Sequence, residues 1–321
     1  MAIVPAAETI ARPRGLVLSR LTPQIAGLVR PLRKTRSAAI AFLRGANTNR
    51  RPGARGALPA SLGRLGSLEV RLATSPREIR LAQALRYQVF YAEGFASAHP
   101  AVAFARRDFD EFDAICDHLL VVDHASGGER VVGTYRLLRQ EVAERHFGFY
   151  SAGEYAIEPL VAAHPQARFL ELGRSCVLAP YRNKRTVELL WHGIWTYVLH
   201  HRIDVMLGCA SLEGTDPDAL ALPLSFLHHH AAADGDWRAR ALPARYVRMD
   251  RLPKERVDPK SALHALPPLI KGYLRLGARF GEGAVVDRHF GTTDVLVVLP
   301  VDAISPRYVA HFGPEAGRHA A

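Results

Sequence analysis

The chain has 321 residues, 48% of them hydrophobic, and a formal net charge of +11 at neutral pH, which suits one large domain with a substantial core. Three cysteines, Cys116, Cys176 and Cys209, are too few and too scattered for a disulfide framework or a zinc site, so a reducing, cytoplasmic compartment is expected. No apolar run reaches the roughly 18 residues that span a bilayer, so an integral membrane protein is not expected.

The chain begins with a basic extension. Residues 1–66 contain twelve Arg or Lys residues and one acidic residue, so the whole positive excess lies there and residues 67–321 are neutral. Residues 46–66 are rich in Gly, Pro and Arg, which predicts a flexible linker. Before it, residues 22–44 can form a basic amphipathic helix, which fits an anionic membrane surface on the inner face of the membrane. A disordered basic tail and an organelle transit peptide are alternatives, whereas only Phe42 could stack on a base, so no nucleic-acid contact is expected.

From residue 67 the pattern alternates between strands and helices. Period-2 and buried apolar runs predict strands at 68–73, 118–123, 131–139, 168–178, 205–210 and 293–300. Apolar residues at helical spacing predict helices at 76–92, 186–201, 216–233 and 269–280, with Thr186 as the N-cap of the second. No internal repeat is visible. The order predicts a single α/β domain over 67–321, with a mixed sheet flanked by helices.

The turn before the second predicted helix is basic. Arg182, Lys184 and Arg185 lie in the turn just before that helix, whose unpaired N–H groups and partial positive charge can hold a phosphate. On spacing alone, an ordinary solvated turn between a strand and a helix is the simpler interpretation.

Several segments resemble one known family in the same order along the chain. They are residues 85–94, 112–123, 132–138, 171–194, 208–217, 266–278 and 289–295. Together they resemble GNAT-type N-acyltransferases, in particular the ornithine N-acyltransferases of ornithine-lipid synthesis. A looser similarity to acyl-homoserine-lactone synthases involves Arg86, Asp110, Asp113, Arg136, Glu171 and Arg174.

The resemblance implies a GNAT-like acyl-CoA N-acyltransferase fold and an amide-forming enzyme. It implies transfer of a 3-hydroxyacyl chain from acyl carrier protein to the α-amine of ornithine, which gives lyso-ornithine lipid. No cofactor is implied beyond the phosphopantetheine arm of the donor. Acyl-homoserine-lactone synthesis, which requires S-adenosylmethionine, and a non-enzymatic membrane-binding module are the alternative functions.

Glu171 is the candidate general base, because a carboxylate on a largely apolar strand should have a raised pKa and the attacking amine must lose a proton. The related synthases imply the same part for the matching glutamate. Strict alternation would place Glu171 and Arg174 on opposite faces, and a β-bulge at Gly173 would bring them together. A purely structural salt bridge between Glu171 and Arg174 is the alternative.

A second set of charged residues suits a zwitterionic substrate with a basic side chain. Arginine can bind a carboxylate through two parallel hydrogen bonds, and a carboxylate can accept from an ammonium. The candidates are Arg86, Asp110, Asp113 and Arg136, with Ser211, Glu213, Thr215 and Asp216 as further polar candidates. Each alone could be a solvated ion, and the last four could form an ordinary Asx or ST turn.

The donor turn differs from the Gly-rich loop of acetyl-CoA users, because residues 181–186 contain no glycine. A bulkier basic turn suits one phosphate and the acidic surface of a carrier protein. Arg182, Lys184, Arg185 and Thr186 are therefore the candidate donor-binding residues. The run His228–His230 is not expected to bind metal, because three consecutive helical residues cannot face one ion and no nearby carboxylate was evident.

Overall fold

The computed structural model describes residues 57–125, 127–305 and Tyr308. The predicted amphipathic helix and most of the predicted linker lie outside the described residues. Among the described residues, the strands are β1 (Gly63–Leu65), β2 (Leu68–Leu72), β3 (Asp117–Asp123), β4 (Arg130–Arg139), β5 (Phe169–Val177), β6 (Val205–Glu213), β7 (Tyr246–Val247), β8 (Arg279–Phe280), β9 (Ala284–Asp287) and β10 (Thr292–Pro300). The α-helices are α2 (Pro76–Tyr87), α3 (Pro100–Ala105), α4 (Gln140–Ala143), α5 (Ile157–Ala163), α6 (Lys184–His201), α7 (Ala221–Ala231), α8 (Pro259–Ala265) and α9 (Pro268–Leu276).

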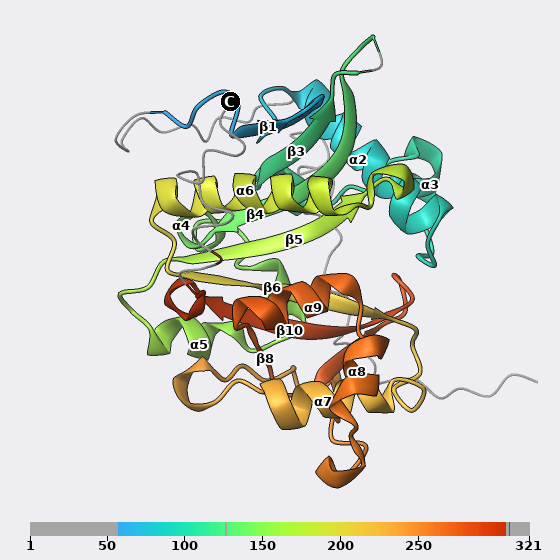
Figure 1. Cartoon of the computed structure of the whole chain (residues 1–321), viewed down its shortest axis with the longest axis vertical. Helices are drawn as coiled ribbons and strands as arrows, with labels where there is room; N and C mark the ends of the chain where they lie inside the picture. The colour runs from blue at the N-terminus through green and yellow to red at the C-terminus, as the bar shows by residue number, and fades with distance from the viewer. Residues whose placement is uncertain (1–56, 126, 306–307, 309–321) are drawn as a thin grey trace, which may run out of the picture.

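All ten strands belong to one sheet in the order β1-β2-β3-β4-β5-β6-β10-β9-β7, with β8 paired to β10 (Figure 1). Every pairing is antiparallel except that of β5 with β6. The predicted mixed sheet flanked by helices is therefore confirmed, and its single parallel pair lies at the centre.

Helices cover both faces of this sheet. Figure 1 shows α6 and α9 across the face toward the viewer. Gly193 of α6 permits a close approach there, because a Cβ atom at this position would lie 2.5 Å from Val70 Cγ2. On the opposite face, Ile157 and Leu160 of α5 join a second core cluster with Phe169 of β5.

The folded domain begins earlier than the sequence predicted. β1 lies within the predicted extension of residues 1–66 and pairs with β2. Leu62, also in that extension, is buried in the main core. Three residues, Gly63–Leu65, are too short a run to show a strand period, so this pairing was not visible in the sequence.

Three predicted helix boundaries are corrected by local hydrogen bonds. Asn183, not Thr186, is the N-cap of α6, since its side chain accepts from the Thr186 N–H. The helix predicted to start at Asp216 starts at Ala221, because Asp216 accepts from the Asp218 N–H and closes an Asx turn first.

The third correction concerns α9, which ends at Leu276. The chain leaves the helix through Gly277 at φ 93°, a left-handed C-cap, and then enters β8. The predicted helix over 76–92 is α2 followed by the short π-helix η1 (Gln88–Ala92).

Candidate active site between two diverging strands

The central strands β5 and β6 pair over only three residues each. The parallel register joins Phe169–Glu171 to 205–207, and beyond it the two strands have no further pairing. A cavity of about 540 Å³ lies in this opening, lined by 172–177 of β5 and by 209–211 of β6. The facing edges of the two strands therefore present backbone N–H and C=O groups without a strand neighbour.

Gly208 stands where the strands begin to separate. A Cβ atom there would lie 2.2 Å from the Leu172 carbonyl oxygen, which is shorter than any real contact. The glycine thus allows the two backbones to touch at the last point before the cavity opens.

The predicted β-bulge in β5 is present, one residue further along. The register with β4 shifts between Thr134 and Arg136, and Arg174 has a left-handed φ of 47°. Glu171 and Arg174 both line the cavity as a result, instead of facing opposite sides of the sheet.

Arg174 is held in place from several sides. Its guanidinium lies 4.7 Å from the Tyr150 ring centroid and 4.8 Å from that of Phe290. Its Nε lies 3.3 Å from Asp108 Oδ2, and its Nη2 donates to Asp110 Oδ2 at 3.3 Å. Among the described residues Arg174 thus pairs with two aspartates and forms no salt bridge with Glu171.

Glu171 is almost completely buried and accepts three hydrogen bonds. The backbone N–H groups of Tyr150 and Ser151 donate at 2.7 Å, one to each carboxylate oxygen, and the Ser151 hydroxyl donates to Oε1 at 2.6 Å. Burial raises the pKa of Glu171, and these hydrogen bonds oppose the rise. The carboxylate borders the cavity, and Oε2 keeps a lone pair beyond its one bond.

The predicted substrate set is drawn together as a buried ionic network. Arg86 is 0% exposed and bonds Asp108 and Asp113, while Arg136 Nη1 donates to Asp110 at 2.6 Å. Although burial opposes it, the charges of Arg86 and Arg136 hold the pKa of Asp113 well below its usual range.

Only part of this network reaches the cavity. Arg136 lines it, whereas Arg86, Asp110 and Asp113 do not. Asp108, which sequence reasoning missed, joins the two arginines Arg86 and Arg174. Its signal was the acidic run at 108–113, of which only two members belong to the synthase pattern.

The further polar candidates also divide into residues that line the cavity and residues that do not. Ser211 and Glu213 line the cavity, but Asp216 and Thr215 do not. Asp216 is occupied by its own turn.

Three acidic side chains that sequence reasoning missed also line the cavity. Glu154 follows the short helical turn η3 (Tyr150–Gly153), Asp287 ends β9, and Asp294 lies in β10. One oxygen of each lies within 4.8 Å of the others. Burial, followed by the charge of Asp294, raises the pKa of Glu154 to about 7. These three residues are far apart in sequence, so no spacing motif marks them.

The predicted donor residues surround the N-terminus of α6. Arg182 lines the cavity and pairs with Glu93 at 3.3 Å, whereas Lys184 is exposed and pairs with Glu188 within the helix. Thr186 is buried and Arg185 is exposed.

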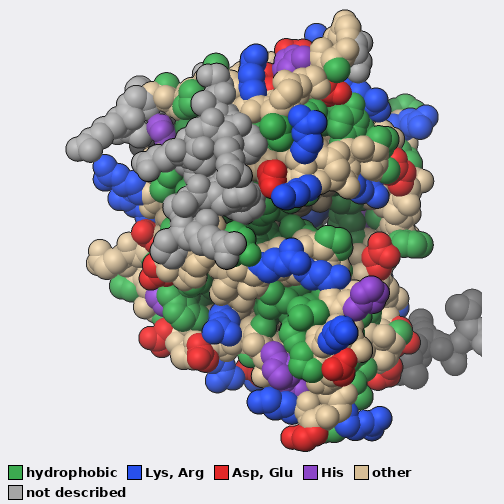
Figure 2. Space-filling model, in the orientation of Figure 1, with side chains coloured by type: hydrophobic (Ala, Val, Ile, Leu, Met, Phe, Trp, Pro, Cys, Tyr) green, Lys and Arg blue, Asp and Glu red, His purple; other side chains and the backbone are tan. Residues whose placement is uncertain are grey.

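An apolar groove of about 370 Å³ runs between α6 and α9 beside this turn. Its lining includes Trp191, Trp195 and Leu276, with Lys184 and Arg275 at its border. Figure 2 shows hydrophobic side chains gathered between these two helices, with Lys and Arg side chains around them.

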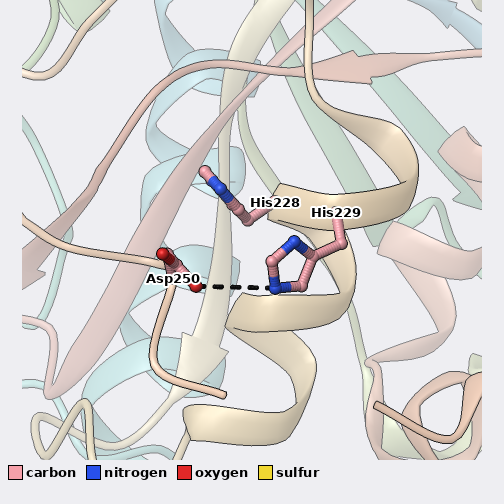
Figure 3. A group of neighbouring side chains, drawn as sticks. All are labelled: His228, His229 and Asp250. Carbon is pink, nitrogen blue, oxygen red and sulfur yellow. Dashed lines mark ion pairs between the residues drawn. The ribbon is translucent and has the colours of Figure 1, made fainter. Parts of the chain in front are cut away.

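The histidine run does meet a carboxylate, contrary to the sequence argument. Asp250 lies beside His228 and His229, and one potential ligand atom of each lies within 4.8 Å of the others (Figure 3). His229 Nε2 lies 2.8 Å from the Leu252 carbonyl oxygen and 3.5 Å from Asp250 Oδ1. Because a carbonyl only accepts, Nε2 carries the proton and has no lone pair for a metal. The contacts tie α7 to the following loop.

Within the described residues, we find no helix whose length and apolar content would let it cross a bilayer.

Comparisons with known proteins give the following similarities. A family model for the acetyltransferase (GNAT) domain matches residues 85–192. The L-ornithine N(alpha)-acyltransferase of Agrobacterium fabrum is 58% identical over 260 residues, which cover 80% of this chain and 88% of that protein. The one from Rhizobium meliloti is 57% identical over 267 residues, covering 82% and 90%. A solved N-acyl amino acid synthase from uncultured soil microbes aligns with a TM-score of 0.42 at 11% identity, covering 73% of this chain and 91% of that one.

Proposed function

The chain belongs to the L-ornithine N(alpha)-acyltransferase family, and from this premise we propose that it transfers a 3-hydroxyacyl chain from acyl carrier protein to the α-amine of ornithine. The product is lyso-ornithine lipid. The observation that carries the proposal is the cavity between β5 and β6, where positive and negative side chains line one space beside unpaired strand edges.

The strand edges suit the donor arm. A phosphopantetheine arm contains two amides, which can pair with the backbone groups of β5 and β6 as an added strand would. The thioester then lies in the cavity, and the apolar side chains of Val89, Phe90 and Leu269 can contact the acyl chain. A backbone N–H group of the open edges can donate to the carbonyl oxygen as it gains charge.

The acceptor is held by its two charged groups. Arg174 contributes Nε and Nη2 to the contacts described above, while Nη1 takes part in none of them. We assign Nη1 to the α-carboxylate of the amino acid. The stacking of Arg174 between Tyr150 and Phe290 fixes the direction in which it donates.

Glu171 takes the proton. The amine nitrogen attacks the thioester carbon, the carbon–sulfur bond breaks, and the arm leaves as a thiolate, which becomes a thiol when it takes up the proton that Glu171 received. The Ser151 hydroxyl can accept the amine proton while it passes its own to Glu171 Oε1, to which it already donates at 2.6 Å.

Acyl carrier protein is the donor best matched to the surface around α6. The turn from Tyr181 to Thr186 has no glycine to wrap a pyrophosphate, and it is rich in basic side chains. The neighbouring apolar groove, bordered by Lys184 and Arg275, is suited to an acidic helical protein.

One assay tests the proposal. The full chain is incubated with ornithine and a 3-hydroxyacyl thioester carried on acyl carrier protein or on coenzyme A, and the lipid extract is analysed by mass spectrometry. We expect the amide of ornithine, formed faster from the carrier protein. A product that forms only when S-adenosylmethionine replaces ornithine would instead identify a homoserine-lactone synthase.

A further inference from the structure

Glu154, Asp287 and Asp294 form a cluster of carboxylates on the wall of the cavity, which we call the acidic cluster. We propose that the acidic cluster is the subsite for the side-chain ammonium of the acceptor amino acid, so that the enzyme selects cationic over neutral amino acids. The inference rests on the proposed function and assigns the group that recognises its substrate.

Glu154 has a buried oxygen that no donor among the described residues satisfies. Its side chain is 6% exposed, and its Oε2 atom is buried with no hydrogen-bond partner. Its Oε1 atom lies 3.3 Å from Nη2 of Arg245, a side chain that is partly exposed to solvent. A buried carboxylate oxygen without a donor is costly, so an occupant that donates a hydrogen bond is expected there.

The other two carboxylates are held in place by donors within the protein. Asp287 Oδ1 accepts from the backbone N–H groups of His289 and Phe290, and Asp294 Oδ1 accepts from the Thr292 hydroxyl. These bonds, together with a hydrogen bond between the side chains of Ser211 and Asp294, fix the two carboxylates. Each carboxylate keeps lone pairs that can accept from a ligand.

The charge of the acidic cluster is not balanced by its surroundings. Burial and the charges of Asp294 and Asp287 raise the pKa of Glu154, while a hydrogen bond from the Cys209 thiol and the charge of Arg245, the one cation among these groups, lower it. Three carboxylates therefore face the Arg245 guanidinium, with Arg174 as a second cation that acts on Asp294. This imbalance favours a bound cation.

An ammonium group fits the acidic cluster. It carries three N–H donors and one positive charge, which match three carboxylates of which one is paired with Arg245. Arg174, assigned to the α-carboxylate, is near enough to act electrostatically on Asp294. One cavity thus offers a cation for the carboxylate of a diamino acid and an anionic cluster for its far amine.

The test compares ornithine with norvaline, which has the same length and lacks the terminal ammonium. Asp294→Asn and Glu154→Gln should raise the KM for ornithine roughly 10- to 100-fold, the loss expected of one hydrogen bond to a charged group. They should change the acylation of norvaline far less, so the ratio of the two kcat/KM values falls. Glu282→Gln, a partly exposed carboxylate that pairs with Arg238 and Arg240, is the matched control and should keep the wild-type ratio.

The pH dependence provides a second readout. Glu154 must be ionised to bind an ammonium, and burial and the charge of Asp294 raise its pKa to about 7. The KM for ornithine should therefore rise as the pH falls through 7, and Glu154→Gln should remove this rise while the KM for norvaline stays level. Melting temperatures identify any variant that fails to fold. If Glu154→Gln does not fold, ornithine binding to folded Asp294→Asn is measured by calorimetric titration in place of the kinetic comparison.

Other outcomes would overturn the inference. An equal loss on ornithine and norvaline would show that the cluster acts in catalysis or folding. Activity of the wild type that is lost in EDTA and restored by Mg²⁺ or Ca²⁺ would show a metal site. If the wild type acylates neither amino acid, the proposed function fails, and weaker calorimetric binding of ornithine by Asp294→Asn than by wild type would still support the subsite.

Discussion

Two glutamates line the same cavity, and their different surroundings give chemically identical side chains different roles. Glu171 is surrounded by three donors at 2.6–2.7 Å, whereas Glu154 has an oxygen with none. The first arrangement stabilises a fixed carboxylate linked to a hydroxyl, and the second leaves room for a ligand. Sequence reasoning selected Glu171 from its apolar strand and its match to a known pattern. It could not select Glu154, because burial and the loss of hydrogen-bond partners are properties of the folded chain.

Replacing Glu171 tests its assignment as the base. Glu171→Gln should lower kcat by roughly 10²–10⁴-fold, the usual effect of losing a general base, because the amide cannot take the proton. Ser151→Ala should give a loss in the same direction, since it removes the hydroxyl that links the amine to Glu171. Single-turnover kinetics at saturating donor measure the chemical step. Wild-type turnover in folded Glu171→Gln would rule out this base.

The site depends on the point at which the strands β5 and β6 stop pairing. The sequence predicted β5 and β6 as strands and a bulge in β5, because apolar runs and the family pattern mark both. It did not predict that Glu171 would be the last residue of β5 to pair with β6. That point is set by backbone contact at Gly208, which depends on a neighbour 36 positions away along the chain.

Gly208→Ala should therefore destabilise the protein more than an ordinary surface change. The new methyl would meet the Leu172 carbonyl oxygen at 2.2 Å, so the strands must shift, at a cost of about 1–3 kcal/mol or more. Gly173→Ala is the matched control in the adjoining strand, because a Cβ there meets nothing within 4 Å. Urea unfolding followed by circular dichroism measures both. Equal midpoints for the two variants would contradict the close approach.

The basic turn before α6 is expected to dock the carrier protein of the donor. Changing Arg182, Lys184 and Arg185 together to Ala should raise the KM for acyl carrier protein and flatten its dependence on salt, because ions screen the attraction of these charges. Turnover at saturating donor should change less. The acyl-coenzyme A thioester serves as a donor without a protein surface. A KM for the carrier protein that stays constant would place docking elsewhere, and the groove between α6 and α9 would be the next surface to test.

For the whole molecule, charge is divided between two regions. The described domain carries a buried network in which arginines and aspartates satisfy one another, while residues 1–56 contain eleven basic residues and one acidic residue. Composition revealed the division at once. It could not locate the boundary, since Leu62 and β1 belong to the fold although they lie in a Gly- and Arg-rich segment.

This division of charge predicts that the basic N-terminal residues bind the enzyme to an anionic membrane. The proposed product is a lipid, and an enzyme held at the inner face of a membrane could release it there. Basic residues near an anionic surface contribute about 1 kcal/mol each, so the full chain should sediment with anionic vesicles at low salt and dissociate at high salt. A chain that starts at Ala57 keeps β1 and should remain in the supernatant with its activity on dispersed substrates unchanged. Neutral vesicles provide the control for apolar insertion, which salt does not reverse. Equal sedimentation of the two chains with anionic vesicles would move the membrane contact to the catalytic domain, where the groove between α6 and α9 carries both apolar and basic side chains.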